Sequence, residues 1–143
     1  MKDIMLKLKG SQTGSDGLEE QTEFMTEGKL YKRNGSYYLL YDESEISGME
    51  GCKTSLKYNE NFLRMKRTGE TEGAYTVIEF NKGKRFSSIY QTPYGPIEME
   101  VMTNIYEHKL TEEGMGSILI DYNVSLIGLM ATRNRLDITI SEQ

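Results

Sequence analysis

The chain has 143 residues, of which 37% are hydrophobic and 27% charged, and its net charge is −5. The composition is typical of a globular protein and argues against intrinsic disorder and a collagen-like repeat. The length suits a single hydrophobic core and is too short for two. We therefore expect one domain over residues 1–143.

The composition also restricts location and chemistry. No apolar run approaches the roughly 18 residues that a membrane-spanning helix needs, and the first nine residues alternate charge with hydrophobe, unlike a secretory signal. We expect a cytoplasmic protein that does not enter a membrane. With one Cys and one His, the chain has no internal disulfide and no zinc site built from four such ligands.

Catalysis is not predicted either. Cys52 and His108 fall on opposite faces of their predicted strands, so they do not form a nucleophile–base pair, and no other such pair is evident. The glycines form neither a dinucleotide-binding nor a phosphate-binding motif. We therefore expect a protein that is not an enzyme and that uses no metal or cofactor.

Apolar residues recur at every second position along most of the chain, which is the signature of strands in an antiparallel sheet. The third run, 37–41, is apolar at both parities, so its inward face stays undecided. In the long run 97–105 the odd positions form the apolar face, which places Tyr106 on the outside. In chain order the alternating runs, about ten in all, are 4–8, 24–30, 37–41, 52–58, 63–67, 78–80, 86–90, 97–105, 118–124 and 136–140.

Tight turns separate some of these runs and longer links separate the others. Asn34-Gly35 is the strongest hairpin signal, because a type I′ turn needs two residues that tolerate positive φ. The turns at 34–35, 59–61, 81–83 and 111–114 should lie together at one end of the sheet, here called the turn end. The longer links 10–19, 42–48, 68–73, 92–96 and 128–134 define the opposite, loop end.

This pattern favours an all-β fold, an antiparallel meander β-barrel of about 8 to 10 strands. Closure of a sheet removes the exposed edges that invite aggregation. A β-sandwich would show the same alternation, but it would need long crossover links, and the hairpin spacing favours the barrel.

Four segments resemble the YwiB-like family of small uncharacterised bacterial β-barrel proteins. They are 37–43 (YYLLYDE), 63–70 (LRMKRTGE), the turn 92–95 (TPYG) and 134–140 (NRLDITI). The resemblance spans nearly the whole chain and implies a calycin-like barrel, the architecture of lipocalins and fatty-acid-binding proteins. It implies no activity, and a shared fold does not transfer function.

Arg67 is the foremost candidate for a ligand site. It shares the apolar face of its strand and lies at the loop end, where a buried guanidinium needs a counter charge. It either covers apolar surface while its head reaches water, or binds a ligand carboxylate or phosphate. Tyr90 and Tyr122 reach the same end, Tyr41 does so if the odd positions of its run face inward, and Tyr94 lies in the proline-flanked turn. The resulting hypothesis is a small, partly apolar, anionic ligand held by Arg67, Tyr90, Tyr94 and Tyr122.

A second hypothesis rests on charge. Residues 16–50 hold nine acids and three bases, a net of −6, whereas residues 51–91 hold eight bases and four acids, a net of +4. Lys53, Lys57, Arg64 and Lys66 should share the outer face of two neighbouring strands. This basic face fits an interaction module, including a homodimer in which it meets the acidic segment of another copy. Nucleic acid is a less favoured partner, because the protein is acidic and no aromatic residues are predicted among these bases.

Overall fold

The structure is a computed structural model that describes residues 1–14, 17–43, 51–69, 75–92, 95–126 and 130–143, with the backbone alone at 75, 90–92 and 130. Ten strands are present: β1 (Lys2–Thr13), β2 (Glu19–Arg33), β3 (Ser36–Asp42), β4 (Lys53–Tyr58), β5 (Phe62–Thr68), β6 (Tyr75–Asn81), β7 (Arg85–Thr92), β8 (Gly95–Leu110), β9 (Gly116–Leu126) and β10 (Met130–Glu142). In these ranges no helix has the length and apolar character needed to cross a membrane.

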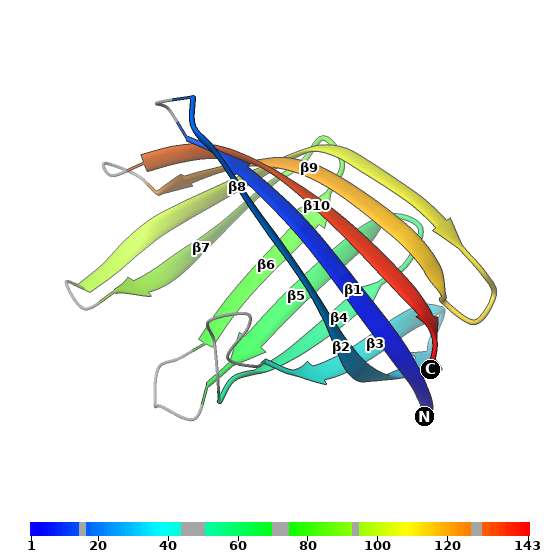
Figure 1. The fold of residues 1–143 in the computed structure, drawn as a ribbon. Coiled ribbons are helices and arrows are strands. Elements are labelled where there is room, and N and C mark those ends of the chain that lie inside the picture. Colours follow the sequence, from blue (N-terminus) through cyan, green and yellow to red (C-terminus); the bar gives the residue numbers. More distant parts are fainter. Residues whose placement is uncertain (15–16, 44–50, 70–74, 93–94, 127–129) are drawn as a thin grey trace.

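All ten strands form one antiparallel sheet in the order β6-β5-β4-β3-β2-β1-β10-β9-β8-β7. Every neighbouring pair except β1–β10 is a hairpin, so the chain is a meander that starts and ends in the middle of the sheet. The sheet coils until β6 and β7 approach each other, and the result is a nearly closed barrel (Figure 1). The predicted meander barrel is thus confirmed.

The period-two alternation explains which side chains fill the barrel. Leu39 and Tyr41 of β3 are buried, whereas Leu40 between them is exposed, so the undecided third run has its odd positions inward. The core comprises Ile4, Leu6, Leu8, Leu30, Leu39, Tyr41, Leu56, Tyr58, Leu63, Phe80, Met99, Val101, Tyr106, Ile118, Ile120, Ile138 and Ile140.

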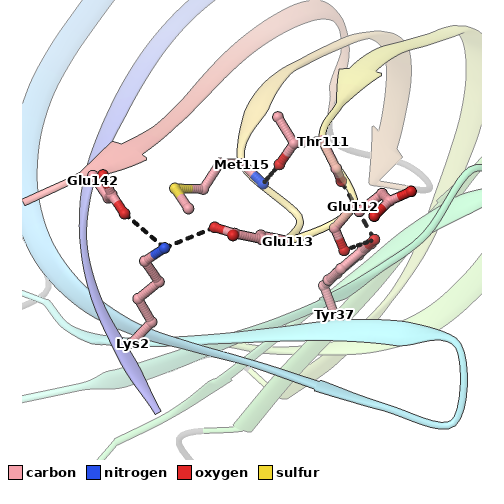
Figure 2. Close-up of polar contacts among 7 residues, drawn as sticks. All are labelled: Lys2, Tyr37, Thr111, Glu112, Glu113, Met115 and Glu142. Atoms are coloured by element: carbon pink, nitrogen blue, oxygen red, sulfur yellow. Dashed lines mark hydrogen bonds and ion pairs between the residues drawn. The ribbon is translucent and has the colours of Figure 1, made fainter.

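Three tyrosines seal the turn end. The hydroxyl of Tyr58 donates to the carbonyl oxygen of Gly114 at 2.7 Å, and that of Tyr106 donates to the carbonyls of Asn59 and Phe62, both at 2.9 Å. Tyr37 donates to the carbonyl of Glu112 at 2.8 Å, as Figure 2 shows. Burial raises the pKa of Tyr58 and Tyr106, so both hydroxyls remain protonated donors that join the turns.

A second layer at this end is ionic. Lys2 lies between Glu113 and Glu142, with its Nζ 2.7 Å from a carboxylate oxygen of each (Figure 2). The turn that begins β3 has the predicted geometry, since Asn34 and Gly35 have φ values of 52° and 79°. Turns and side chains together therefore close the base of the barrel.

The facing predicted for the end of β8 is wrong. The register of β8 against β9 shifts between Thr103 and Ile105, which is a β-bulge. One extra residue reverses the alternation from there on, so Tyr106 points inward and is only 7% exposed. His108 follows the same inward parity, but it lies beyond the core and is exposed.

Candidate functional site

A polar cluster lies on the inward face of the barrel at the loop end. Thr54 of β4 is the cross-strand neighbour of Arg67 of β5, and Tyr41 of β3 is the neighbour of Thr54 on its other side. Glu43, just beyond β3, accepts a hydrogen bond from the Thr54 hydroxyl at 2.6 Å. The same carboxylate oxygen lies 3.3 Å from Nη2 of Arg67.

The Glu43–Arg67 pair changes the interpretation of Arg67. The arginine lies inward, where the alternation places it, and its side chain is 24% exposed. However, the counter charge that it needs comes from the same molecule, because Glu43 is adjacent and its side chain is 1% exposed. An unbalanced positive charge is therefore no longer the reason to place a ligand here.

Two hydrogen-bonding groups of the cluster nevertheless lack a partner. Among the described residues, Nε of Arg67 and the hydroxyl of Tyr41 are buried and without a hydrogen bond. Buried donors of this kind carry a free-energy cost unless an acceptor meets them. Burial, and then the nearby charge of Glu43, raise the pKa of Tyr41, so its hydroxyl stays protonated and able to donate.

Inward side chains become more accessible from the turn end toward the loop end. On β5, Leu63 is fully buried, whereas Met65 and Arg67 are partly exposed. On β9, Ile120 is fully buried, whereas Tyr122 and the inward residues that follow it are partly exposed. The same change occurs along β6 and, on β10, from Ile138 to Leu136 and Asn134, although Thr132 beyond them is buried. The interior is therefore packed at its base and accessible near the cluster. The partly buried apolar residues against the core include Phe24, Met65, Ile78, Phe86, Val124, Leu126 and Leu136.

The structure brings some of the predicted ligand residues together. Tyr122 lies close enough to Arg67 for that charge to oppose the rise that burial causes in the pKa of Tyr122. Its ring packs on Phe80 of β6 with 4.5 Å between centroids. Tyr90 lies in β7, but its side chain is not described, and Tyr94 lies outside the described residues.

Sequence reasoning missed Glu43 and Thr54 as neighbours of Arg67, and it left the facing of Tyr41 open. The positions of Thr54 and Tyr41 beside Arg67 depend on the register between strands, which alternation alone does not fix. Glu43 was assigned to a loop, and no period applies beyond a strand end. The one available signal was the charge itself, since an inward arginine needs an acid and Glu43 is the acid next to the strand.

The predicted basic face exists, but two of its four charges, those of Lys57 and Arg64, have partners on the same chain. Lys57 lies over the ring of Tyr38 at 5.7 Å and over that of Phe62 at 5.9 Å, and Arg64 pairs with Glu79 at 3.1 Å. Outward aromatic residues therefore do lie among these bases, contrary to the expectation. They contact the lysine of their own chain.

Lys53 and Lys66 border a groove of about 590 Å³ on the outside of the barrel, where β2 separates from β3. The acids Asp3, Glu27 and Asp42 line the same groove, so its charge is mixed. Within the described ranges, no group of three or more His, Cys, Asp or Glu side chains is arranged to hold a metal ion.

Comparisons with known proteins agree with this architecture. The chain is 29% identical over 109 residues to the uncharacterized beta-barrel protein YwiB of Bacillus subtilis (strain 168), covering 76% of this chain and 72% of YwiB. The crystal structure of the ywiB protein from Bacillus subtilis superposes with a TM-score of 0.82 at 25% identity, over 99% of this chain and 92% of that one. The resemblance noted in the sequence is thus confirmed. A family model described as a domain of unknown function, DUF1934, matches residues 6–138, and the chain therefore belongs to the DUF1934 family.

Proposed function

We propose that the protein binds, without transforming it, a small and partly apolar molecule whose carboxylate head group enters the barrel at the loop end. The observation that carries this proposal is the pair of buried, unpartnered groups, Arg67 Nε and the Tyr41 hydroxyl, at the accessible end of an otherwise packed interior. A ligand with oxygen acceptors would satisfy both.

The contacts of Arg67 leave a donor for such a ligand. Its contact to Glu43 uses one nitrogen, Nη2, at 3.3 Å, which is longer than the 2.7–2.9 Å usual for a charge-assisted hydrogen bond. The same Nη2 lies 3.9 Å from Sδ of Met65. A guanidinium has five N–H donors, and Arg67 uses Nη2 toward Glu43, so Nε–H is left to donate to a second carboxylate.

Glu43 has two opposing effects in this scheme. It compensates the charge of Arg67 while no ligand is bound, which stabilises the empty barrel. It also weakens the attraction between Arg67 and an incoming carboxylate, because the Glu43–Arg67 pair has no net charge. Replacement of Glu43 by glutamine should therefore strengthen carboxylate binding, whereas loss of Arg67 should weaken it.

The apolar part of the ligand is suggested by the surroundings. Met65 and Ile78 are cross-strand neighbours on the inward face, next to Arg67, and both are partly exposed. Tyr122 offers an aromatic ring to the ligand. Burial raises the pKa of its hydroxyl, so the side chain is neutral and does not repel an anion. A saturated carboxylate such as decanoate combines the expected head group with a flexible chain.

The test is titration calorimetry with decanoate and with decanol, the uncharged counterpart. We expect decanoate to bind the wild type more tightly than decanol does, and Arg67→Leu to weaken decanoate binding by about tenfold or more, the equivalent of one charge-assisted bond. Arg64→Leu is the matched control, since Arg64 is on the same strand, faces outward and is also paired with an acid.

Three results would reject the proposal. The first is no heat of binding with decanoate or decanol at any concentration. The second is equal weakening of decanoate binding by Arg67→Leu and Arg64→Leu, and the third is weaker decanoate binding by Glu43→Gln than by the wild type. The first result excludes the ligand class, and the other two remove Arg67 and its environment as the head-group site.

A further inference from the structure

The barrel has an open seam between β6 and β7, the two terminal strands of the sheet. Backbone hydrogen bonds near the seam are confined to its turn end: Lys84 donates to Asn81 at 2.9 Å, Gly83 donates to Thr103 at 3.0 Å, and Thr103 donates to Lys84 at 3.4 Å. Among the described residues, no backbone hydrogen bond joins the rest of β6 to the rest of β7. Each strand therefore presents a free edge of N–H and C=O groups.

The free edge of β7 lacks the usual protection against strand pairing. Natural edges carry lysine, proline, bulges or inward charges, whereas residues 86–92 (FSSIYQT) contain neither a charge nor a proline. Arg85 begins the strand, and its charge is paired with Glu100 of β8 at 2.7 Å. Ile89 is 53% exposed on the outer face. An uncharged edge with an exposed isoleucine is a template for another strand.

A second copy of this chain fits that edge by charge. Each copy has a net charge of −5, so copies repel each other over most contact faces. Antiparallel pairing of two β7 edges about a two-fold axis at Ile89 places Ile89 opposite itself and Ser87 opposite Gln91, with no like charges opposed. The free edge of β6 is less suitable, because Glu79 lies within it and is already paired with Arg64.

We propose that two copies of the chain associate through antiparallel pairing of their β7 edges, with the two-fold axis at Ile89. The pairing extends the ten-stranded sheet of each copy into the other. It satisfies backbone groups that water alone covers in the single copy, and it removes two exposed isoleucine side chains from solvent. This surface is distinct from the basic face and from the ligand site.

The first test measures mass by sedimentation from micromolar to millimolar concentration. We expect a concentration-dependent dimer that persists at high salt, since the paired strands are uncharged. Ile89→Lys should raise the dimer dissociation constant by about tenfold or more, because two like charges come to lie opposite each other. Leu40→Lys is the matched control, because Leu40 is 37% exposed on β3, where it is paired with β2 on one side and with β4 on the other, and it should leave the constant unchanged.

A second test locates the contact. In a Cys52→Ser background, Ile89→Cys should form an intermolecular disulfide on mild oxidation, and Leu40→Cys should not. A monomer at every concentration would overturn the proposal. So would a dimer that salt disperses, one that Ile89→Lys leaves intact, or one that Ile89→Cys fails to cross-link, because each places the contact elsewhere.

Discussion

Replacement of Glu43 by leucine should destabilise the protein through Arg67 rather than through lost packing. The change leaves a largely buried guanidinium without its acid and the Thr54 hydroxyl without its acceptor at 2.6 Å. Removal of one partner of a buried ion pair costs about 3–5 kcal/mol. Because the Arg67 side chain keeps 24% exposure, water screens part of this cost, and we expect a loss of about 2–3 kcal/mol.

The double variant Glu43→Leu/Arg67→Leu separates charge from packing. It replaces both charges by apolar groups, so its free energy of unfolding should return to within about 1 kcal/mol of the wild-type value. Urea unfolding followed by circular dichroism measures all four proteins of the cycle, and tryptophan fluorescence is not usable because the chain has none. Strictly additive losses in the double variant would show that the two side chains do not interact and would refute the reasoning.

Three further predictions concern the turn end and the outer face. Tyr58→Phe removes the donor to the Gly114 carbonyl at 2.7 Å and should cost about 1–2 kcal/mol in urea unfolding; an unchanged midpoint would exclude a role for this bond. Gly114→Ala should cost about 1–3 kcal/mol, since φ is +87° and a Cβ would lie 2.4 Å from the ring of Tyr37; wild-type stability would show that the turn relaxes freely. Burial alone would raise the pKa of Asp121, but the hydrogen bond and charge of Arg133 outweigh it and lower the pKa overall. Asp121 therefore stabilises the fold above its unfolded pKa of about 3.9, and this contribution should fade as the pH falls below that value. The melting temperature of Asp121→Asn should therefore fall less steeply with decreasing pH than that of the wild type. Parallel curves of melting temperature against pH for the two proteins would contradict this.

The fold could be predicted from the sequence because one signal, the alternation of apolar and polar residues, repeats along nearly every strand. Alternation placed Leu39, Leu56 and Ile120 on faces that an antiparallel sheet must bury. The dipeptide Asn34-Gly35 marked a hairpin, because few residue pairs tolerate its backbone angles. These signals are local, and a meander built from hairpins needs little else.

Features that depend on the register between strands or on an irregularity such as a bulge could not be predicted from the sequence. The β8 bulge has no distinctive residue, yet it turned Tyr106 inward and made it part of the base of the barrel. The apolar third run hid Tyr38 as an outward partner of Lys57. Glu43 lies just past a strand, so only the three-dimensional structure shows that it neutralises Arg67. The candidate site was thus located by Arg67 and completed by residues that no local pattern identifies.

The most direct test of the ligand site is the ¹H–¹⁵N resonance of Arg67 Nε–H during a decanoate titration. We expect this resonance to move until the protein is saturated, while that of Arg64 Nε–H, on the outer face of the same strand, stays in place. Saturation with decanoate that leaves the Arg67 resonance unmoved would contradict the account, because the head group would then be held elsewhere.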